Sequence, residues 1–534
     1  MIAIIGAGIS GLAAAQRILR RNESSGRTTE FVVFEASDRV GGVISTRHEN
    51  GFLVEESSDN FITTNPWAIQ LCDELGLRDT LTGTDPTIRK TFVVRRGRLH
   101  PLPDGFLMMA PTRIWPMALT PILSPFGKLR AAMEYILPRR HDPTDESVRG
   151  FATRRLGREV FERLIEPLVS AVYAADMDRL SVDATLPQFR DMEREHRSLI
   201  CAMRANAAKR RRAERTARHA AKANLHFVGN RRKPDGSSSS TASGDTGARY
   251  SLFMTPRDGL ETMATAIRER IETAPEATLR LGCRADRIEP TLNGRYRVTW
   301  RTGGEGGDET DDGGNCAGDQ KSAEFDSVIL AVPSHQAASI VQKLDPTLAA
   351  ELAKITHSGT AVLTVAFRAD QVRNPLRAAG AVVPSIENLP LLAISFSNRK
   401  YPHRAPDGTV LLRVFAGGAK HEPILKLDDA ALRRTLLDAL RPLLSIEGEP
   451  IYATLARWER TMPQFHIGHR ELVVRIREHE ASHPRFALAG NFLDGVGIPH
   501  CIHTGWTAAE RCIADQSATD DNPAAAVSTP DGGA

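Results

Sequence analysis

The feature that most constrains the fold is a glycine motif near the start of the chain. Gly6, Gly8 and Gly11 form a G-x-G-x-x-G pattern directly after the apolar run 2–5, and a helical pattern follows from Leu12. In such a strand–turn–helix, the first glycine allows a tight turn, the second lets the backbone approach a pyrophosphate, and the third lets helix and strand pack closely. A second apolar run at 31–34 completes a βαβ unit. The chain is therefore predicted to begin with an α/β sheet that binds a dinucleotide.

Two features after the second strand favour one dinucleotide over the others. Glu35 ends that strand, where a carboxylate can accept the ribose hydroxyls and would repel a 2′-phosphate, so FAD or NAD is favoured over NADP. The stretch RVGG at 39–42 follows at once, and its two glycines let the backbone run past a cofactor while Arg39 can neutralise phosphate. At this spacing the second motif favours FAD.

Composition excludes several classes of protein. With 534 residues the chain can form about three domains. The 69 basic and 65 acidic residues leave a net charge of +4, which gives no reason to expect a nucleic-acid partner. The six cysteines show no C-x-x-C pair and the sixteen histidines no metal-ligand spacing, so neither a disulfide framework nor a metal site is expected. No stretch approaches about 20 uninterrupted apolar residues. A cytoplasmic protein is predicted, with peripheral contact on the inner face of the membrane left open.

Changes in pattern divide the chain into seven segments. Apolar runs at 328–332, 361–367 and 411–415 indicate strands of a mixed α/β part, while the Ser-rich stretch near 237–243 cannot bury enough apolar surface to order itself. The predicted segments are a first FAD-binding part (1–100), a helical membrane or substrate domain (101–204), a low-complexity basic and Ser-rich insertion (205–248), a second FAD-binding part (249–330) with a flexible loop (302–322), a substrate-binding domain (331–480), a C-terminal FAD-binding part (481–514) and a disordered tail (515–534).

The segment GNFLDGVGIPHCI at 490–502 is the most specific in the chain. A buried strand ends in Gly-Asn, a glycine-rich turn follows, and a second helix begins whose N-terminus can stabilise negative charge on a reduced flavin. The segment resembles the C-terminal signature of protoporphyrinogen and coproporphyrinogen oxidases, FAD-dependent members of the amine oxidase superfamily. The stretches EPLVSAVYAADMDRLSV (166–182), MEREHRSLI (192–200) and PHRAPDG (402–408) resemble the same family in the same order.

The resemblance implies a fold and a cofactor site. The fold would be α/β, with a Rossmann-like FAD-binding domain of the amine oxidase type, a mixed α/β substrate domain and a mostly helical inserted domain. FAD would be bound without a covalent link, since the surroundings of Cys501 do not match the covalent amine oxidases. The cofactor would contact Gly6, Ala7, Gly8, Ile9, Ser10, Gly11, Glu35, Ala36, Arg39, Gly42, Val43, Ser57, Ser58, Asp59, Asn60, Ala285, Asn491, Val496, Gly497 and Ile498.

The resemblance also implies the reaction. The family oxidises protoporphyrinogen IX or coproporphyrinogen III to the porphyrin in haem biosynthesis, with hydride transfer to flavin N5 and dioxygen reduced to hydrogen peroxide. Such chemistry needs positioning more than a side-chain base, so no catalytic acid or base is nominated. The substrate would contact Ala171, which is predicted to lie in a loop, VSAVYAAD. It would also contact Val382 and Phe396, which would clamp a pyrrole ring. Relatives carry a propionate-binding Arg where this chain has Thr91, so Arg89 or Lys90 is the candidate anchor.

Each of these interpretations has alternatives. Val43, Ala285, Val382 and Phe396 are also what ordinary core packing would place in or beside strands. Arg89 and Lys90 are equally plausible as solvated surface charges. A flavin desaturase or amine oxidase with another apolar substrate, and a flavin-binding module without activity, are the competing functions. Hand-over of the porphyrin to a ferrochelatase is a further expectation from the family.

Overall fold

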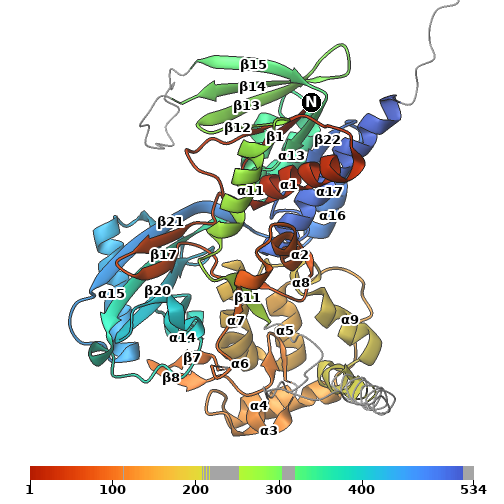
Figure 1. Ribbon diagram of the computed structural model, residues 1–534. Helices are drawn as coiled ribbons and strands as arrows, with labels where there is room; N and C mark the ends of the chain where they lie inside the picture. The colour runs from red at the N-terminus through yellow and green to blue at the C-terminus, as the bar shows by residue number, and fades with distance from the viewer. Residues whose placement is uncertain are drawn as a thin grey trace, which may run out of the picture.

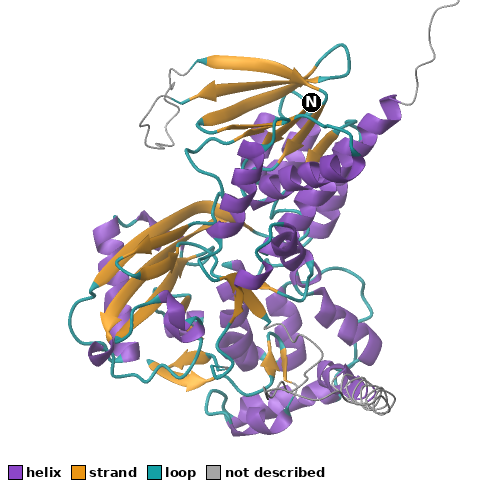
Figure 2. Ribbon diagram, viewed as in Figure 1, coloured by secondary structure: helices purple, strands orange, loops and turns teal. Residues whose placement is uncertain are grey.

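The computed structural model describes residues 1–88, 90–111, 113–206, 252–303 and 319–520, with isolated positions between 208 and 216. Figure 1 shows two regions: one contains the N-terminal strand and the long C-terminal helix, and the other contains a large sheet beside a group of helices. Figure 2 shows that strands and helices form separate layers in the first region, whereas one side of the second region is almost entirely helical. The predicted α/β class with a helical part is confirmed.

The first region is built on a five-stranded parallel sheet. Its order is β12-β2-β1-β16-β22. Alternate residues of β1 face opposite sides, with Ile2 and Ile4 in one core cluster and Ala3 and Ile5 in another, so both faces of the sheet are covered. The strands are β1 (Ile2–Ile5), β2 (Phe31–Phe34), β12 (Ala277–Arg280), β16 (Ser327–Leu330) and β22 (Phe486–Leu488).

Different layers cover the two faces. Helices α1 (Ile9–Ser25), α2 (Trp67–Glu74), α11 (Glu261–Thr273) and α17 (Ile498–Asp520) cover one face. The other face packs against the antiparallel sheet of β13 (Cys283–Pro290), β14 (Tyr296–Thr302) and β15 (Gln320–Phe325), and against α12 (Ser334–Ile340), α13 (Pro346–Ala353) and α16 (His469–Ala481). Strands β14 and β15 flank the loop predicted at 302–322 and pair with each other, and β15 begins two residues before the predicted end of the loop. Residues 304–318 of that loop lie outside the described residues.

The second region contains a seven-stranded sheet in the order β21-β17-β20-β19-β18-β7-β8. One face packs on the leucine-rich side of α15 (Asp429–Leu444). The opposite face meets the hairpin of β3 (Thr46–Glu49) and β4 (Phe52–Glu55) and the helical domain. The strands are β7 (Phe92–Arg95), β8 (Arg98–Pro101), β17 (His357–Arg368), β18 (Gly380–Val382), β19 (Ala393–Phe396), β20 (Thr409–Gly417) and β21 (Tyr452–Pro463).

Three predicted segment boundaries differ from the structure. Helix α17 continues to Asp520, although the sequence placed the start of a disordered tail at 515; residues 521–534 lie outside the described residues. β7 and β8 pair with β18 in the seven-stranded sheet, although the sequence placed residues up to 100 in the first FAD-binding part. Helices α12, α13 and α16 pack on the parallel sheet, although the sequence placed 331–480 in the substrate domain. Strand pairing and helix packing bring together segments that are far apart along the chain. A change in the sequence pattern along the chain therefore does not mark the boundaries of these layers.

The helical domain is held by buried ion pairs that explain one sequence motif. Its main helices include α3 (Ile114–Leu119), α4 (Pro125–Ala132), α5 (Val148–Leu156), α7 (Glu166–Tyr173) and α9 (Pro187–His196). Glu193, in the stretch MEREHRSLI, accepts from Arg154 at 2.6 Å. Glu134 pairs with the fully buried Arg155 and accepts from the Ser198 hydroxyl at 2.6 Å. Removing one partner of such a pair leaves an uncompensated buried charge.

Candidate functional site

The glycine motif forms a tight turn between β1 and α1. Gly6 has a φ of +100°, and a Cβ on it would lie 2.6 Å from the carbonyl oxygen of Ala331. A Cβ on Gly11 would lie 1.9 Å from the carbonyl oxygen of Gly6. A Cβ on Gly8, by contrast, would meet no atom of the described residues within 4 Å. Two glycines are therefore required by packing, and the third faces open space at the N-terminus of α1.

The carboxylate of Glu35 lies across this turn. Its Oε2 accepts from the backbone N–H of Ala7 at 2.7 Å, and its Oε1 accepts from the N–H and hydroxyl of Ser37 at 3.0 and 2.8 Å. Strand β13 begins beside it, because the N–H of Cys283 donates to the Glu35 carbonyl at 2.7 Å. Ala285 follows on β13, is 8% exposed and pairs with Trp300. Ala36 is exposed at the same edge.

The RVGG stretch closes the other side of the turn. Gly41 forms a bridge with Gly8 and donates to the Ala7 carbonyl at 2.9 Å, while Gly42 has a φ of +59°. Arg39 lies in the same turn, and its terminal nitrogens donate to the carbonyls of Gly42 at 2.6 Å, Ile44 at 3.1 Å and Val40 at 3.2 Å. Arg39 therefore holds the turn, and these contacts engage the groups that were expected to neutralise phosphate.

Beyond the double glycine, the segment 57–60 lies against Val43. The Val43 side chain is 41% exposed, and its carbonyl accepts from the Ser57 hydroxyl. Ser58 is exposed. Asp59 turns away from this side: its Oδ2 lies 2.6 Å from Nζ of Lys400, and its Oδ1 accepts from the Asn60 amide at 2.8 Å. The Asp59 carboxylate is therefore engaged by the protein itself.

Sequence reasoning missed the cations around Asp59. Arg413 approaches its Oδ2 at 3.4 Å, and Arg404 at 3.7 Å while donating to its backbone carbonyl at 2.9 Å. Burial alone would raise the pKa of Asp59, but Lys400, Arg413 and Arg404 hold it well below its usual range. The stretch PHRAPDG contains Arg404, but nothing in this local pattern indicates that Arg404 lies beside Asp59.

The C-terminal segment completes the same edge of the parallel sheet. The Asn491 amide donates to the carbonyl of Thr461 on β21 at 3.1 Å, so one of its two N–H donors is engaged by the protein. Val496 and Gly497 lead into α17, which begins at Ile498. Helix α17 crosses α1 closely, because a Cβ on Gly505 would lie 2.1 Å from the carbonyl oxygen of the buried Ser10. Helices α1 and α17 therefore both have their N-termini at this edge of the sheet.

The candidate substrate residues are only partly brought together. Val382 and Val496 pack in the same apolar cluster as the helical domain. Phe396 is fully buried in the cluster formed with α15, on the opposite face of the sheet, so it does not face Val382. Ala171 is exposed, as expected of a contact residue, but it lies within α7 and not in a loop. Lys90 is exposed, and Arg89 lies outside the described residues.

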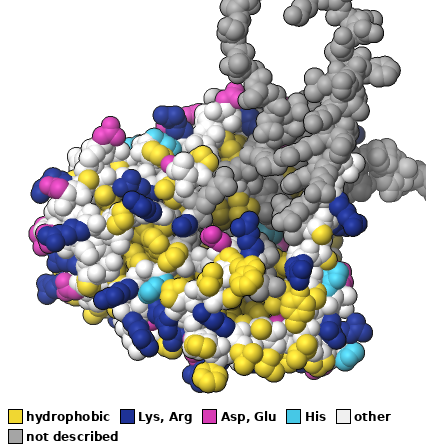
Figure 3. Space-filling model, turned by 90° about the horizontal axis from the view of Figure 1, so that it is seen from below, with side chains coloured by type: hydrophobic (Ala, Val, Ile, Leu, Met, Phe, Trp, Pro, Cys, Tyr) yellow, Lys and Arg dark blue, Asp and Glu magenta, His cyan; other side chains and the backbone are white. Residues whose placement is uncertain are grey.

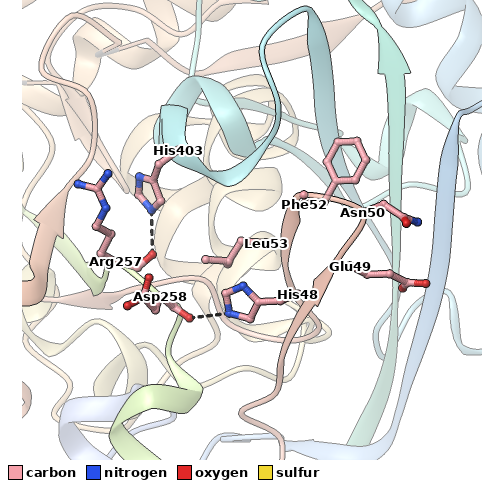
Figure 4. A pocket seen from close by; sticks show the side chains of 9 residues that line it. His48, Glu49, Asn50, Phe52, Leu53, Arg257, Asp258 and His403 are labelled. Atoms are coloured by element: carbon pink, nitrogen blue, oxygen red, sulfur yellow. Dashed lines mark hydrogen bonds between the residues drawn. The ribbon is translucent and has the colours of Figure 1, made fainter.

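A separate polar pocket lies beside the β3–β4 hairpin (Figure 4). Its volume is about 380 Å³, and none of the predicted cofactor residues lines it. The Nε2 atoms of His48 and His403 lie 3.1 and 3.0 Å from the carbonyls of Asp258 and Arg257. These two ring nitrogens are therefore engaged by the backbone. Within the described part of the chain, no three His, Cys, Asp or Glu side chains cluster as metal ligands.

Comparison with known proteins decides between the dinucleotides. The model of the family described as flavin containing amine oxidoreductase matches residues 9–513. The chain belongs to this family. FAD is accordingly its cofactor.

Individual relatives span nearly the whole length. Coproporphyrinogen III oxidase of Bacillus subtilis (strain 168) is 32% identical over 513 residues, 96% of this chain and 97% of that protein. Protoporphyrinogen oxidase 1, chloroplastic, of Arabidopsis thaliana is 29% identical, with 95% and 86% covered. A crystal structure from Exiguobacterium sp. 255-15, named for protoporphyrinogen oxidase, is 27% identical, has a TM-score of 0.75 and covers 97% of this chain and 98% of that one.

The geometry of the turn fits this flavin cofactor. The open space at Gly8 and the N-terminus of α1 would receive the pyrophosphate, and Glu35 would accept from the adenosine ribose. When bound, FAD supplies the acceptor of a hydride. Val43 and Ser57 would border the flavin on one side, and residues 496–498 on the other. The N-terminus of α17 would direct positive partial charge toward that space.

Proposed function

We propose that this flavoenzyme oxidises a porphyrinogen to the corresponding porphyrin in haem biosynthesis. The observation that carries the proposal is similarity along nearly the whole chain to proteins named coproporphyrinogen III oxidase and protoporphyrinogen oxidase. The glycine turn and Glu35 support it, since every residue of the dinucleotide fingerprint is in place.

The surface between the cofactor edge and the helical domain suits an apolar macrocycle. One apolar cluster contains Val496, two residues before α17, Val382 and Ala393 on the sheet, and Tyr173 on α7. Burial raises the pKa of the Tyr173 hydroxyl to about 12, so this group stays protonated at neutral pH. We infer that the residues on this side position the substrate and exclude water, while the cofactor would accept the hydride.

The decisive experiment compares substrates on the purified holoenzyme. Protoporphyrinogen IX and coproporphyrinogen III are supplied separately in air, and porphyrin fluorescence and hydrogen peroxide are followed together. Dioxygen as acceptor predicts three peroxides for each porphyrin formed, because six electrons leave the macrocycle in three two-electron steps. Gly8→Ala is the control expected to lose activity through loss of FAD. Oxidation of a primary amine without any porphyrin formation would favour the amine oxidase alternative.

A propionate anchor near the start of β7 is part of the proposal. Lys90 is exposed, and its backbone carbonyl accepts from Ala379 at 2.8 Å, which fixes the backbone while leaving the ammonium available. A distant carboxylate is bound alike in the ground and transition states. Lys90→Ala should therefore raise KM and spare kcat, and Thr91→Arg should restore KM. An unchanged KM in Lys90→Ala and in the double variant with Arg89→Ala would place the anchor elsewhere.

Peripheral contact with a lipid surface is proposed for the helical domain. Trp115, Leu119, Phe126, Leu129 and Ile136 project from α3, α4 and the turn after α4 with 66 to 84% of their surface exposed. Seen from below, apolar side chains gather beside Lys and Arg side chains on this end of the molecule (Figure 3). Exposed aromatic and aliphatic groups with nearby cations match the interfacial region of an anionic membrane. None of the described helices is long and apolar enough to cross a membrane.

Vesicle sedimentation tests this contact. The holoenzyme is expected to pellet with vesicles of phosphatidylglycerol and phosphatidylcholine, and the Trp115→Ser/Phe126→Ser variant to remain in the supernatant. Leu292→Ser is the matched control, because Leu292 is fully exposed in the turn between β13 and β14. Equal sedimentation of all three proteins would refute the assignment of this surface. Hand-over of the porphyrin to a ferrochelatase stays a prediction.

A further inference from the structure

Behind the segment 57–60 lies a buried cluster of charged side chains. Lys400 ends the short helix α14 (Ser397–Lys400), Arg404 ends the 3₁₀ turn Pro402–Arg404, and Arg413 lies on β20. They surround Asp59 and Glu55, the last residue of β4. The side chains of Arg404 and Arg413 are 1% exposed, and that of Glu55 is fully buried.

The cluster contains more positive than negative charge. Three cations face two carboxylates, so at least one positive charge is not balanced within it. Burial raises the pKa of Glu55, and Arg404, 3.4 Å from its Oε1, opposes that shift only in part. Burial likewise lowers the pKa of Lys400, against the opposing effect of Asp59, so the permanently charged Arg404 and Arg413 carry the positive charge of the cluster. Charges removed from water act over longer distances than surface charges, because little solvent screens them.

Several donors of the cluster are not used up by the protein. The Nε atoms of Arg404 and Arg413, and Nη1 of Arg404, have no hydrogen-bond acceptor among the described residues. The same is true of the buried hydroxyl of Ser395, which pairs with Arg413 across β19 and β20. A cluster that served only to join β4 to the sheet would be expected to satisfy these buried groups.

The cluster directly contacts the segment that would border the flavin. Arg413 donates to the carbonyl of Ser57, whose hydroxyl donates to the carbonyl of Val43. On β21, which is separated from β20 by β17, Trp458 donates to the carbonyl of Glu56 at 2.8 Å, and three residues later Thr461 accepts from Asn491. Arg413 also lies on the face of β20 away from α15, because its neighbours Leu412 and Val414 pack on α15.

We propose that Lys400, Arg404 and Arg413 raise the reduction potential of the bound flavin. Hydride transfer brings two electrons and one proton to the neutral oxidised ring and leaves it with one additional negative charge. A fixed positive excess beside the ring favours that reduced form and requires no reorganisation during the reaction. This inference rests on the flavoenzyme function proposed above, and it names residues that position charge without contacting the substrate.

The test compares paired variants of the purified holoenzyme. The fraction of reduced flavin is measured in equilibrium with a redox dye, together with the affinity for sulfite, which adds to the flavin and leaves a negative charge on it. Arg413→Met should shift the equilibrium against the reduced form ten-fold or more, about 30 mV for a two-electron couple. Arg413→Lys keeps the charge and should stay within about three-fold of wild type. Asp59→Asn removes a negative charge and should shift the equilibrium the other way.

The pattern of signs separates this role from a structural one. Sulfite affinity should fall in Arg413→Met and rise in Asp59→Asn, whereas structural damage would act in the same direction in both. Lys400→Met repeats the first test if Arg413→Met does not fold. Arg475→Met is the control, since Arg475 pairs with Glu351 at 3.0 Å on the outer side of α16. Unchanged equilibria in all cluster variants, or shifts of one sign only, would overturn the proposal. These measurements use no porphyrinogen, so they stand even if the substrate proposal fails.

Discussion

Replacing Gly8 by Ala should separate cofactor binding from folding. Gly8 has φ −67° and ψ 174°, which alanine adopts readily, and its added Cβ would meet no described atom within 4 Å. The free energy of unfolding of the apoprotein should therefore stay within about 1 kcal/mol of wild type. The methyl group would instead occupy the space reserved for the pyrophosphate. A steric cost of about 1 to 3 kcal/mol corresponds to a loss of roughly 5- to 150-fold in FAD affinity.

The assay for Gly8→Ala uses two measurements on the same apoprotein. Urea unfolding gives the stability, and quenching of FAD fluorescence on titration gives the affinity. Gly11→Ala is the contrasting variant, because its Cβ would lie 1.9 Å from the Gly6 carbonyl oxygen and must disturb the fold itself. Wild-type FAD affinity in Gly8→Ala would refute the placement of the pyrophosphate. Loss of stability in Gly8→Ala as large as in Gly11→Ala would refute the distinction between the two glycines.

Three further predictions follow from the same geometry. Glu35→Gln should weaken FAD binding by about 1.5 to 3 kcal/mol, the scale of a hydrogen bond to a charged group, as titration of the apoprotein would show; unchanged affinity would mean that the ribose is held elsewhere. Gly505→Ala should lower the urea midpoint of the apoprotein, because its Cβ would lie 2.1 Å from the Ser10 carbonyl oxygen; a wild-type midpoint would contradict the close crossing of α1 and α17. His469 is 4% exposed, and burial lowers its pKa to about 4, so its neutral form is favoured in the folded state. Stability should therefore fall as pH drops from about 6.5 to 4, by at most about 1.4 kcal/mol per pH unit, and His469→Phe should flatten that slope.

Local patterns in the sequence predicted the start of the fold well. The strand, glycine turn and helix between Ile2 and Ser25 follow from short-range sterics, and Glu35 lies at the end of β2 where the βαβ geometry requires it. The family and its cofactor, recognised from motifs spread along the chain, are confirmed. The roles of the individual site residues stay predictions.

Features that depend on distant segments were not predictable in the same way. Asp59 and Lys400 are 341 positions apart, so no local pattern shows that they form an ion pair. Phe396 was expected to clamp a pyrrole ring together with Val382, but the two side chains lie on opposite faces of the sheet. Successive side chains of a strand point to opposite faces, and the elements that pack on the sheet determine which face is buried against which layer. Arg39 was assigned to phosphate by its charge, whereas the shape of the turn assigns its nitrogens to three backbone carbonyls.

The order of strands in the parallel sheet has a consequence for biosynthesis. β1 begins at Ile2, yet its neighbour β16 begins at Ser327, and the strand and helix that complete the cofactor edge begin at Phe486 and Ile498. At about 5 to 20 residues per second, roughly 25 to 100 seconds separate translation of the first glycine turn from translation of α17. During that time the nascent chain exposes the apolar face of α1 that α17 later covers. Until α17 has been made, this face of α1 lacks the helix that covers it in the folded protein.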